Sequence, residues 1–331
     1  MKRIGLFLVL TGILITSGCA ANAPASTPTP KLVATNTPLP SPTPEPHGSL
    51  ALELAFEFNN TPDRLTAPYG IALDSAGNIY INDAGNSRVV VFDDAGKFLA
   101  KWDKEGSGDG EFKSLGFGGI AIDANDNVFV VDNGNHRIQK FDKAGNFLLQ
   151  WGSEGIEDSQ FVRAIGIATD KDGNVYVTDD GNPFVQKFDN NGKFIMKFGG
   201  GGVDDGQFRH ATGIAVDAQG NIFVADYQNK RVQKFNNAGE FITLWRMGTD
   251  VKISGVPEAI AIDKQGRVYV TDYDFGRMQV FTNDGDFLWA LSSEKIMDSI
   301  LKRPVGLAFD ANGYILIVNQ SGNSVQAFNL P

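Results

Sequence analysis

The chain has 331 residues with 29 basic and 39 acidic side chains, a formal net charge of −10 and 42% hydrophobic residues. This hydrophobic content supports a folded core, and the acidic balance argues against nucleic acid as a partner, because such partners need clustered Lys and Arg. The single Cys excludes an internal disulfide and a Cys-rich zinc site, and three His (His47, His136 and His210) leave little room for a His-rich metal centre.

The first 18 residues have the pattern of a signal peptide. A positively charged start precedes an apolar run over residues 5–15, which is too short to span a bilayer. The following Thr16-Ser17-Gly18-Cys19 resembles a bacterial lipobox, although Thr16 stands where Leu is usual. This resemblance implies that Cys19 is lipidated, so that the protein is extracytoplasmic and anchored to the bacterial cell membrane or envelope. A plain secretory signal with an incidental Cys is the alternative.

Residues 19–49 are rich in Pro, Thr and Ser. Eight of the 14 prolines lie between residues 20 and 48. Pro-rich chains stay extended and do not pack a core. We therefore expect a lipidated, disordered stalk over residues 19–49 and a folded domain over residues 50–331.

One pattern recurs six times in this folded domain. It is a Gly-Ile-Ala type of run that ends in Asp, and its copies are 46 to 49 residues apart. A fixed period in this range indicates a repeat architecture. The six copies are residues 70–74, 119–123, 166–170, 213–217, 259–263 and 306–310.

Each repeat is predicted to form four short antiparallel strands, because β-branched and aromatic runs alternate with Gly-rich turns. The first strands are almost wholly apolar, which indicates burial on both faces, and the small Ala at their centres predicts crowding at an axis. The fourth strands are expected at residues 98–102, 147–151, 194–198, 241–245 and 287–291. Four-stranded units arranged radially give an all-β, six-bladed β-propeller.

The sixth repeat ends at Phe328 without a fourth strand of its own. Residues 52–56 precede the first repeat and have the spacing of an outer strand that ends in an aromatic residue. We therefore expect this N-terminal strand to close the last blade, since closure removes an exposed sheet edge.

The start of the third strand carries a family resemblance. Residues 135–141 read Asn-His-Arg-Ile-Gln-Lys-Phe, and residues 86–92 and 229–235 follow the same pattern. This pattern resembles the NHL repeat signature. The resemblance covers about residues 50–331 and implies the propeller fold, but it does not specify a function.

A repeated Asp and Arg flank the loop between the second and third strands. Blades three and six lack the Arg, because Phe184 and Ser324 occupy its place, and blade six also has Asn319 for Asp. Because the pair recurs with the repeat, we interpret it as structural, with the Asp capping the turn and pairing with the Arg. The set is Asp83, Arg88, Asp132, Arg137, Asp179, Asp226, Arg231, Asp272 and Arg277.

Ligand-binding residues are expected where the repeat is broken. The loops that join blades and the loops between strands two and three open on one face, called the top face below, which is the usual ligand surface. A mixed, moderately basic rim there suits an anionic or peptide ligand, while ordinary loop polarity is the alternative. The candidates are Lys113, Arg163, Arg209, His210, Glu258 and Arg303, with Tyr69, Phe117, Tyr227 and Tyr273 as aromatic contacts.

These features predict a membrane-anchored, extracytoplasmic binding or scaffold propeller for a protein, peptide or envelope glycan, with no catalytic residue assigned. Some NHL proteins resemble peptidyl-hydroxyglycine amidating lyases, which hold catalytic zinc with several His beside a Tyr and an Arg, so a metal-dependent lyase or hydrolase is the alternative. Only His136 and His210 lie outside the stalk, fewer than the three protein ligands usual for catalytic zinc. Residues 170–174 echo part of a calcium loop but fit a tight turn better. We therefore expect no cofactor.

Overall fold

The computed structural model describes residues 48–49, 54–58, 64–248, 255–291 and 301–330. The predicted signal peptide, Cys19 and nearly all of the predicted stalk lie outside these residues. Within the described part of the chain, no helix is both long enough and apolar enough to cross a membrane.

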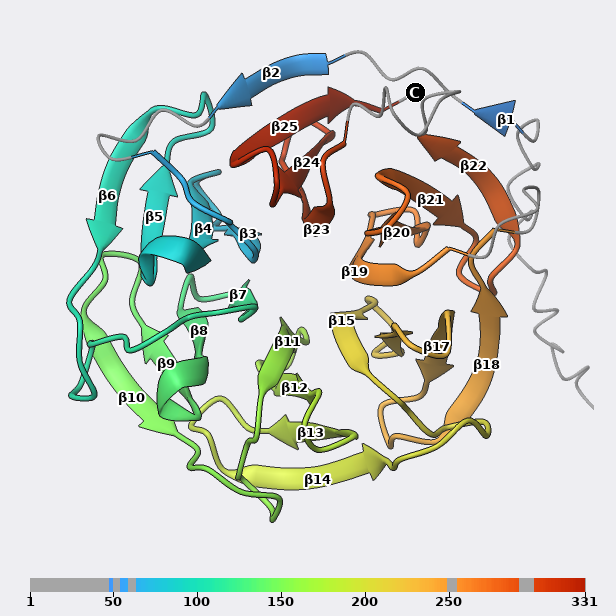
Figure 1. The fold of residues 1–331 in the computed structure, drawn as a ribbon, viewed down its shortest axis with the longest axis horizontal. Coiled ribbons are helices and arrows are strands. Elements are labelled where there is room, and N and C mark those ends of the chain that lie inside the picture. The colour runs from blue at the N-terminus through green and yellow to red at the C-terminus, as the bar shows by residue number, and fades with distance from the viewer. Residues whose placement is uncertain (1–47, 50–53, 59–63, 249–254, 292–300, 331) are drawn as a thin grey trace, which may run out of the picture. The chain divides into compact units, whose positions relative to one another are not determined.

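The strands form six sheets arranged as blades around a central axis (Figure 1), as the repeat predicted. Blade one contains β3 (Ile71–Leu73), β4 (Ile79–Asp83), β5 (Arg88–Phe92) and β6 (Phe98–Trp102); blade two contains β7 (Ile120–Ile122), β8 (Val128–Asp132), β9 (Arg137–Phe141) and β10 (Phe147–Trp151). Blade three contains β11 (Ala164–Thr169), β12 (Val175–Asp179), β13 (Phe184–Phe188) and β14 (Phe194–Gly199); blade four contains β15 (Ala211–Val216), β16 (Ile222–Asp226), β17 (Arg231–Phe235) and β18 (Phe241–Arg246).

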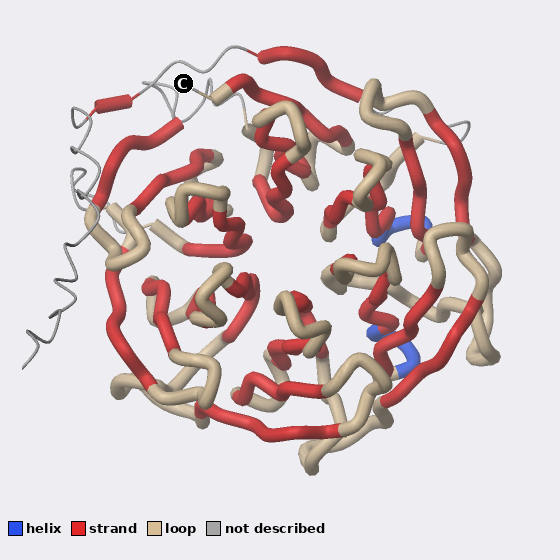
Figure 2. The backbone as a smooth tube through the Cα atoms, turned by 180° about the vertical axis from the view of Figure 1, so that it is seen from behind, coloured by secondary structure: helices blue, strands red, loops and turns tan. Residues whose placement is uncertain are grey.

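Blade five contains β19 (Pro257–Ile262), β20 (Val268–Asp272), β21 (Arg277–Phe281) and β22 (Phe287–Leu291), and blade six contains β23 (Pro304–Phe309), β24 (Tyr314–Asn319) and β25 (Ser324–Asn329). Two short 3-10 helices, η1 (Ala84–Asn86) and η2 (Asn133–Asn135), lie in the loops between the second and third strands of blades one and two. Seen from behind, the first strands meet at the centre and the outer strands follow the circumference (Figure 2).

The N-terminal strand β2 (Leu54–Phe58) closes blade six by pairing antiparallel with β25, which confirms the predicted closure. The described strand covers residues 54–56 of the predicted range 52–56 and continues to Phe58, while residues 52 and 53 lie outside the described part of the chain. The Phe58 ring packs on Phe92 of blade one with 4.8 Å between centroids and lies against Gly96.

A further strand was not predicted. β1 (Gly48–Ser49), at the end of the expected stalk, pairs parallel with β22 and becomes a fifth strand of blade five. The N-terminal segment therefore contacts two adjacent blades, five and six.

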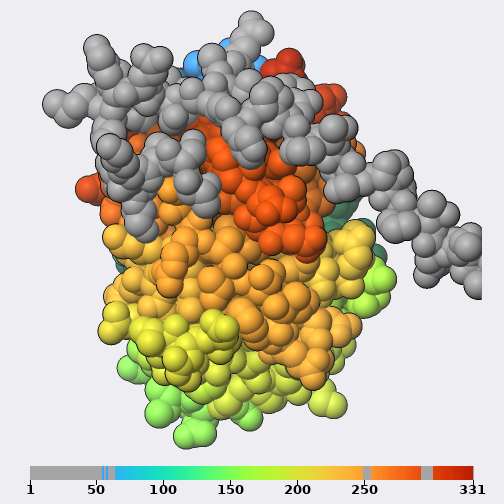
Figure 3. Space-filling view, turned by 90° about the vertical axis from the view of Figure 1, so that its right-hand side faces the viewer, coloured from blue at the N-terminus to red at the C-terminus, as the bar shows by residue number. Residues whose placement is uncertain are grey.

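The core lies between the blades. Each interface is one apolar cluster, such as the cluster in which Tyr80 and Val91 of blade one meet Val128 and Phe141 of blade two. An aromatic ring of each of the first four outer strands packs on the third-strand Phe of the next blade, as Trp102 does on Phe141 with centroids 5.2 Å apart. Blades four and five, yellow to orange in Figure 3, consequently abut along the side of the ring.

The first strands of neighbouring blades approach each other closely at the axis because they contain Gly there, and not because of the Ala that the sequence suggested. A Cβ on Gly213 would lie 2.3 Å from the Glu258 carbonyl oxygen, and one on Gly166 would lie 2.3 Å from the Thr212 carbonyl oxygen. The residues after these glycines, including Ile214, line the central hollow, whereas the central Ala side chains pack into the clusters between blades. The expectation that Ala faces the axis was therefore wrong.

Candidate binding site at the mouth of the channel

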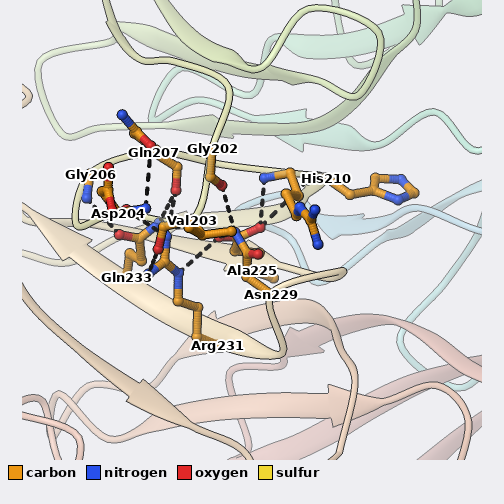
Figure 4. A network of polar contacts seen from close by, with 12 residues as sticks. Gly202, Val203, Asp204, Gly206, Gln207, His210, Ala225, Asn229, Arg231 and Gln233 are labelled. Carbon is orange, nitrogen blue, oxygen red and sulfur yellow. Dashed lines mark hydrogen bonds and ion pairs between the residues drawn. The ribbon is translucent and has the colours of Figure 1, made fainter.

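The repeated Asp and Arg form a clasp that fixes the top-face loops. In blade four, Arg231 Nε donates to Asp226 Oδ2 at 2.9 Å, and its two Nη atoms donate to the carbonyls of Val203, Asp204 and Gln207 at 2.7–3.0 Å (Figure 4). The loop that enters the blade is thereby tied to its second and third strands. Both side chains of the ion pair are almost fully buried.

The Asp–Arg ion pair of this clasp recurs in blades one, two and five. The ion pairs are Arg88–Asp83 at 2.7 Å, Arg137–Asp132 at 2.8 Å and Arg277–Asp272 at 2.6 Å. Blade six has a neutral version, in which Asn319 accepts from the Lys302 N–H and donates to Gln326 at 2.9 Å.

Blade three keeps the carboxylate without the Arg. Asp179 accepts the backbone N–H groups of Val162, Arg163 and Gly181 at 2.8–3.0 Å. Burial raises the pKa of Asp179, and these hydrogen bonds oppose the shift. The clasp residues are thus occupied in holding loops, which is a structural role.

Inside the ring of clasps lies a hollow of about 130 Å³ on the propeller axis. First strands of all six blades line it, and its walls are mostly Gly and Ile or Leu. Two polar side chains reach it, Tyr69 from blade one and Glu258 from blade five. An apolar cavity with a few convergent polar groups is the usual form of a small-ligand site.

Tyr69 and Glu258 bind each other. The Tyr69 hydroxyl donates to Glu258 Oε1, and Glu258 is only 7% exposed. Burial raises the pKa of Glu258 to about 7, while the hydrogen bond from Tyr69 and the nearby His210 act in the opposite direction. Burial and Glu258 also raise the pKa of Tyr69, which therefore remains a proton donor. Glu258 is the carboxyl group of this site that changes charge near neutral pH.

His210 and Arg163 converge on Asp180, which follows the clasp Asp of blade three. His210 Nε2 lies 2.9 Å from Asp180 Oδ1, and Arg163 contacts Asp180 Oδ2. Burial is the main cause that lowers the pKa of His210, and Arg163 adds to it. A neutral His210 with its proton on Nε2 satisfies Asp180 as a donor. The imidazole points away from the blade-four clasp (Figure 4).

Aromatic rings continue the site around the axis. The His210 and Tyr227 rings are 5.1 Å apart, and the Tyr227 and Tyr273 rings are 6.5 Å apart. The Arg303 guanidinium stacks on Tyr273 at 5.3 Å, and the Tyr273 hydroxyl donates to Gln320 at 3.1 Å. A second hollow of about 230 Å³ lies beside Tyr273, Lys302 and Arg303.

We use the word mouth for this connected set. Its members are Tyr69, Arg163, His210, Tyr227, Glu258, Tyr273 and Arg303. Of the other candidates, Phe117 is 51% exposed and packs on Tyr69. Lys113 and Arg209 have exposed side chains and line neither hollow, and their backbone N–H groups point to the clasp residues Asp132 and Asp226.

Comparison with known proteins agrees with this architecture. A family profile described as a 6-bladed β-propeller matches residues 63–151, and an NHL repeat profile matches residues 208–235. Human NHL repeat-containing protein 3 is 39% identical over 54 residues, which is 16% of this chain and 16% of that protein. The chain is an NHL-repeat six-bladed β-propeller.

Solved structures share the fold of this NHL propeller at low identity. Virginiamycin B lyase from Staphylococcus aureus is 14% identical, with a TM-score of 0.60 over 85% of this chain and 100% of that one. A gluconolactonase from Xanthomonas campestris is 17% identical, with a TM-score of 0.59 over 81% of this chain and 88% of that one. At these identities the similarities establish the fold alone, so a function has to be argued from the residues of the mouth.

The zinc site of an amidating lyase does not fit this NHL propeller. His136 Nδ1 lies 3.1 Å from the Val162 carbonyl oxygen on an exposed loop, and His210 is engaged with Asp180. Among the described residues, no three His, Cys, Asp or Glu side chains are grouped as metal ligands. At residues 170–174, Asp170 instead accepts the backbone N–H groups of Asp172 and Asn174 at 3.0 and 2.8 Å, as in an Asx turn.

Sequence reasoning missed Asp180 and Gln320. Both occupy the position directly after the clasp residue, which varies from blade to blade: Ala84, Asn133, Asp180, Tyr227, Tyr273 and Gln320. This variable position next to an almost constant one was the available signal. The two tyrosines were selected as aromatic contacts, but Asp180 resembled part of the repeated acidic pattern.

Proposed function

We propose that this chain is a lipid-anchored, extracytoplasmic binding propeller that holds an anionic group of a protein, peptide or envelope glycan at its mouth. The convergence of residues that break the repeat carries this proposal. Arg163, His210, Glu258 and Arg303 come from four blades: Glu258 lines the axial hollow, Arg303 lines the second hollow, and Arg163 and His210 meet at Asp180. The repeated Asp and Arg hold the top-face loops in place. The residues that differ between blades are therefore the candidates for contacting a ligand.

The charge of the mouth supports an anion as the ligand. Arg303 is exposed and has no ion pair among the described residues, and the Tyr273 face holds its guanidinium in place. Lys302 adds a second exposed cation beside it. A guanidinium fixed on an aromatic ring loses little freedom when it binds an anion.

Crosslinking in intact cells tests the binding role. A photoreactive amino acid at Phe117, at the edge of the mouth, should give ultraviolet-dependent adducts. The same group at Lys171, an exposed turn on the opposite face by strand topology, is the matched control. Adducts that form equally at both positions, or at neither, would contradict a binding mouth.

Anchoring through Cys19 is a separate part of the proposal. Cys19→Ala should move the protein from the membrane fraction to the soluble fraction, because two or more acyl chains are needed for stable anchoring. Thr27→Ala in the proline-rich segment is the control and should leave the protein on the membrane. Retention of the Cys19→Ala protein on membranes would refute lipidation.

A lyase or hydrolase is the second candidate, favoured by Glu258. A buried carboxyl with a pKa of about 7 beside a Tyr and a His is suited to acid–base catalysis. The known propellers of similar fold include a lyase and a gluconolactonase. Turnover of a streptogramin B or of gluconolactone that Glu258→Gln abolishes would favour this candidate. No turnover by the wild-type protein would remove it for these substrates.

A further inference from the structure

The hollow on the propeller axis is lined by two tiers of side chains. The lower tier takes one aliphatic residue from the first strand of each blade: Ile71, Ile120, Ile167, Ile214, Ile260 and Leu307. The upper tier lies two residues earlier in the chain and contributes Tyr69, Ile165, Glu258 and Val305 to the lining. The pairing of Pro257 with the clasp residue Asp272 places this upper tier nearer to the top face. The hollow therefore has a hydrocarbon end and, toward the top face, a polar end.

Glu258 is the one charged residue that lines this hollow within the described structure. It breaks the repeat, because the same position in the other blades holds Tyr69, Gly118, Ile165, Thr212 or Val305. Glu258 is more than nine-tenths buried, and its Oε1 accepts from the Tyr69 hydroxyl. Its Oε2 has no hydrogen-bond partner among the described residues, yet it is not one of the fully enclosed polar atoms. This oxygen is therefore open to the hollow and available to a donor from a ligand.

The size and the lining of the hollow define what it can hold. Its volume is about 130 Å³, and an apolar cavity of roughly 150 Å³ binds a molecule as large as benzene. The aliphatic tier suits a short hydrocarbon chain, and Glu258 Oε2 suits a donor at the end of that chain. An anionic end group would meet the carboxylate without a compensating cation, because no Lys, Arg or His of the described residues lines the hollow. A positively charged end group would pair with the carboxylate.

We propose that the axial hollow binds a primary alkylammonium group, whose hydrocarbon chain lies between the aliphatic side chains and whose ammonium donates to Glu258. The inference goes beyond the proposed function, because it assigns a second site to a group of the opposite charge. The axial hollow and the hollow beside Arg303 share no lining residue among those described. A free alkylamine and the side chain of a lysine both present such a group.

The charge of Glu258 predicts how binding depends on pH. The titratable groups around it are Tyr69, His210, Tyr227, Tyr273 and Asp274. Burial raises the pKa of Glu258 to about 7, Tyr69 and His210 lower it, and Asp274 raises it. An ammonium in the hollow favours the ionised carboxylate, so below this pKa binding releases a proton from Glu258. Affinity should therefore rise by roughly tenfold per pH unit up to pH 7 and then level off, since alkylamines stay protonated to about pH 10.

The test is a saturation-transfer NMR titration of the full chain in detergent at pH 5.5, 7.0 and 8.5, with empty micelles as the blank. The probe n-butylamine is compared with 1-butanol, and Nα-acetyl-lysinamide is compared with Nα-acetyl-norleucinamide. At pH 8.5 at least one amine should bind roughly tenfold or more tightly than its neutral counterpart, because a charge-assisted hydrogen bond is added. Its affinity should fall by pH 5.5. Binding of n-butylamine alone indicates a free amine as the ligand, and binding of the lysine derivative indicates a side chain.

Glu258→Gln keeps the shape of the side chain and removes its charge. The variant should lose both the preference for the amine and the dependence on pH, and thermal melting checks that it is folded. Glu240→Gln, on an exposed turn of blade four, should behave as the wild type. A measurement on the wild-type protein needs no variant: calorimetry in two buffers of different ionisation heat should show the release of roughly half a proton at pH 7.

Four results would overturn the inference. They are equal binding of amine and neutral probe, tighter binding of the amine at pH 5.5 than at pH 8.5, failure of both amines to bind at pH 8.5, and a pH dependence that survives in folded Glu258→Gln protein. Each would leave the proposed binding function to the crosslinking from Phe117, because the anion is assigned to the separate hollow beside Arg303.

Discussion

Asp226 and Glu258 are both buried carboxyl groups of the top face, but they differ in the hydrogen-bond donors that surround them. Asp226 is fully buried and accepts from the Arg231 guanidinium, the Asn229 amide and the Arg209 backbone N–H. Glu258 is almost as buried but accepts from Tyr69 alone among the described side chains. One lies inside the clasp of its own blade, and the other lines the hollow on the axis.

The difference distinguishes a carboxylate with a structural role from a carboxyl group that is a candidate for a functional role in the same protein. A carboxylate surrounded by donors is stable as an ion and holds a loop in place. A carboxyl with one neutral donor and a hollow beside it keeps its proton longer and is available to a ligand. The first arrangement recurs in blades one, two, four and five, and Glu258 occurs once.

Breaking the clasp should have the largest effect. Arg231→Met leaves Asp226 buried without its cation, so the free energy of unfolding should fall by about 3–5 kcal/mol in denaturant titrations. Arg246→Met is the control, because Arg246 is exposed and donates to the Asn229 carbonyl, and it should cost under about 1 kcal/mol. Equal losses in the two variants would show that the clasp is not a stabilising unit.

Replacing Glu258 by a neutral residue should stabilise the protein at neutral pH, whereas breaking the clasp destabilises it. The ordinary pKa of Glu is 4.5 and that of Glu258 is about 7, so between these values the folded protein holds a proton that the unfolded chain has released. Stability is therefore lost as pH rises through this window, by about 3 kcal/mol in total. Glu258→Gln should remove that loss, measured as the free energy of unfolding at pH 4 and pH 8. A Gln variant with the wild-type pH slope would assign the slope to another group.

A neutral clasp should recover part of the lost stability. Asp226→Asn with Arg231→Ser gives blade four the pair that blade six has in Asn319 and Ser324. Removing both charges avoids an unpaired buried ion, so the double variant should lose about 1–2 kcal/mol, less than Arg231→Met. A double variant less stable than Arg231→Met would mean that blade four depends on the ion pair itself.

Removing the single donor to Glu258 should have the smallest effect. Tyr69→Phe deletes the hydrogen bond that lowers the pKa of Glu258, so this pKa should rise above about 7. Carbon-13 NMR titration of the labelled Glu carboxyl groups measures it, and stability should fall by about 1 kcal/mol. Tyr227→Phe, which removes a hydroxyl not bonded to Glu258, should leave the pKa closer to the wild-type value. A pKa that falls in Tyr69→Phe would contradict the geometry of the pair.

The sequence predicted the fold well because each blade is encoded locally. The expected outer strands at residues 98–102 and 147–151 match β6 and β10, and the closing strand β2 pairs with β25 as expected. Phe58, the last residue of β2, packs on Phe92 of blade one. The strand β1 left no periodic signal, since its two residues pair through the backbone.

The mouth was predicted only as a set of residues. Arg163, His210, Glu258 and Arg303 were selected because they interrupt the repeat. Their partners were not apparent, because Asp180 follows a repeated Asp and looks like part of it. The sequence also gave no reason to separate Lys113 and Arg209, whose side chains are exposed, from His210 and Arg163, whose side chains contact Asp180.

By itself, the sequence determined the number of blades, the strands in each blade and the Asp–Arg clasps, because these depend on residues within one repeat period. The tertiary structure alone decided that Tyr69 meets Glu258, 189 residues away, and that a carboxyl there is buried beside a hollow. Closure of the ring brings blade one next to blade six, so that the first residues of blades one and five reach each other across the axis. Contacts of this kind depend on the curvature of the whole ring, which no single repeat encodes.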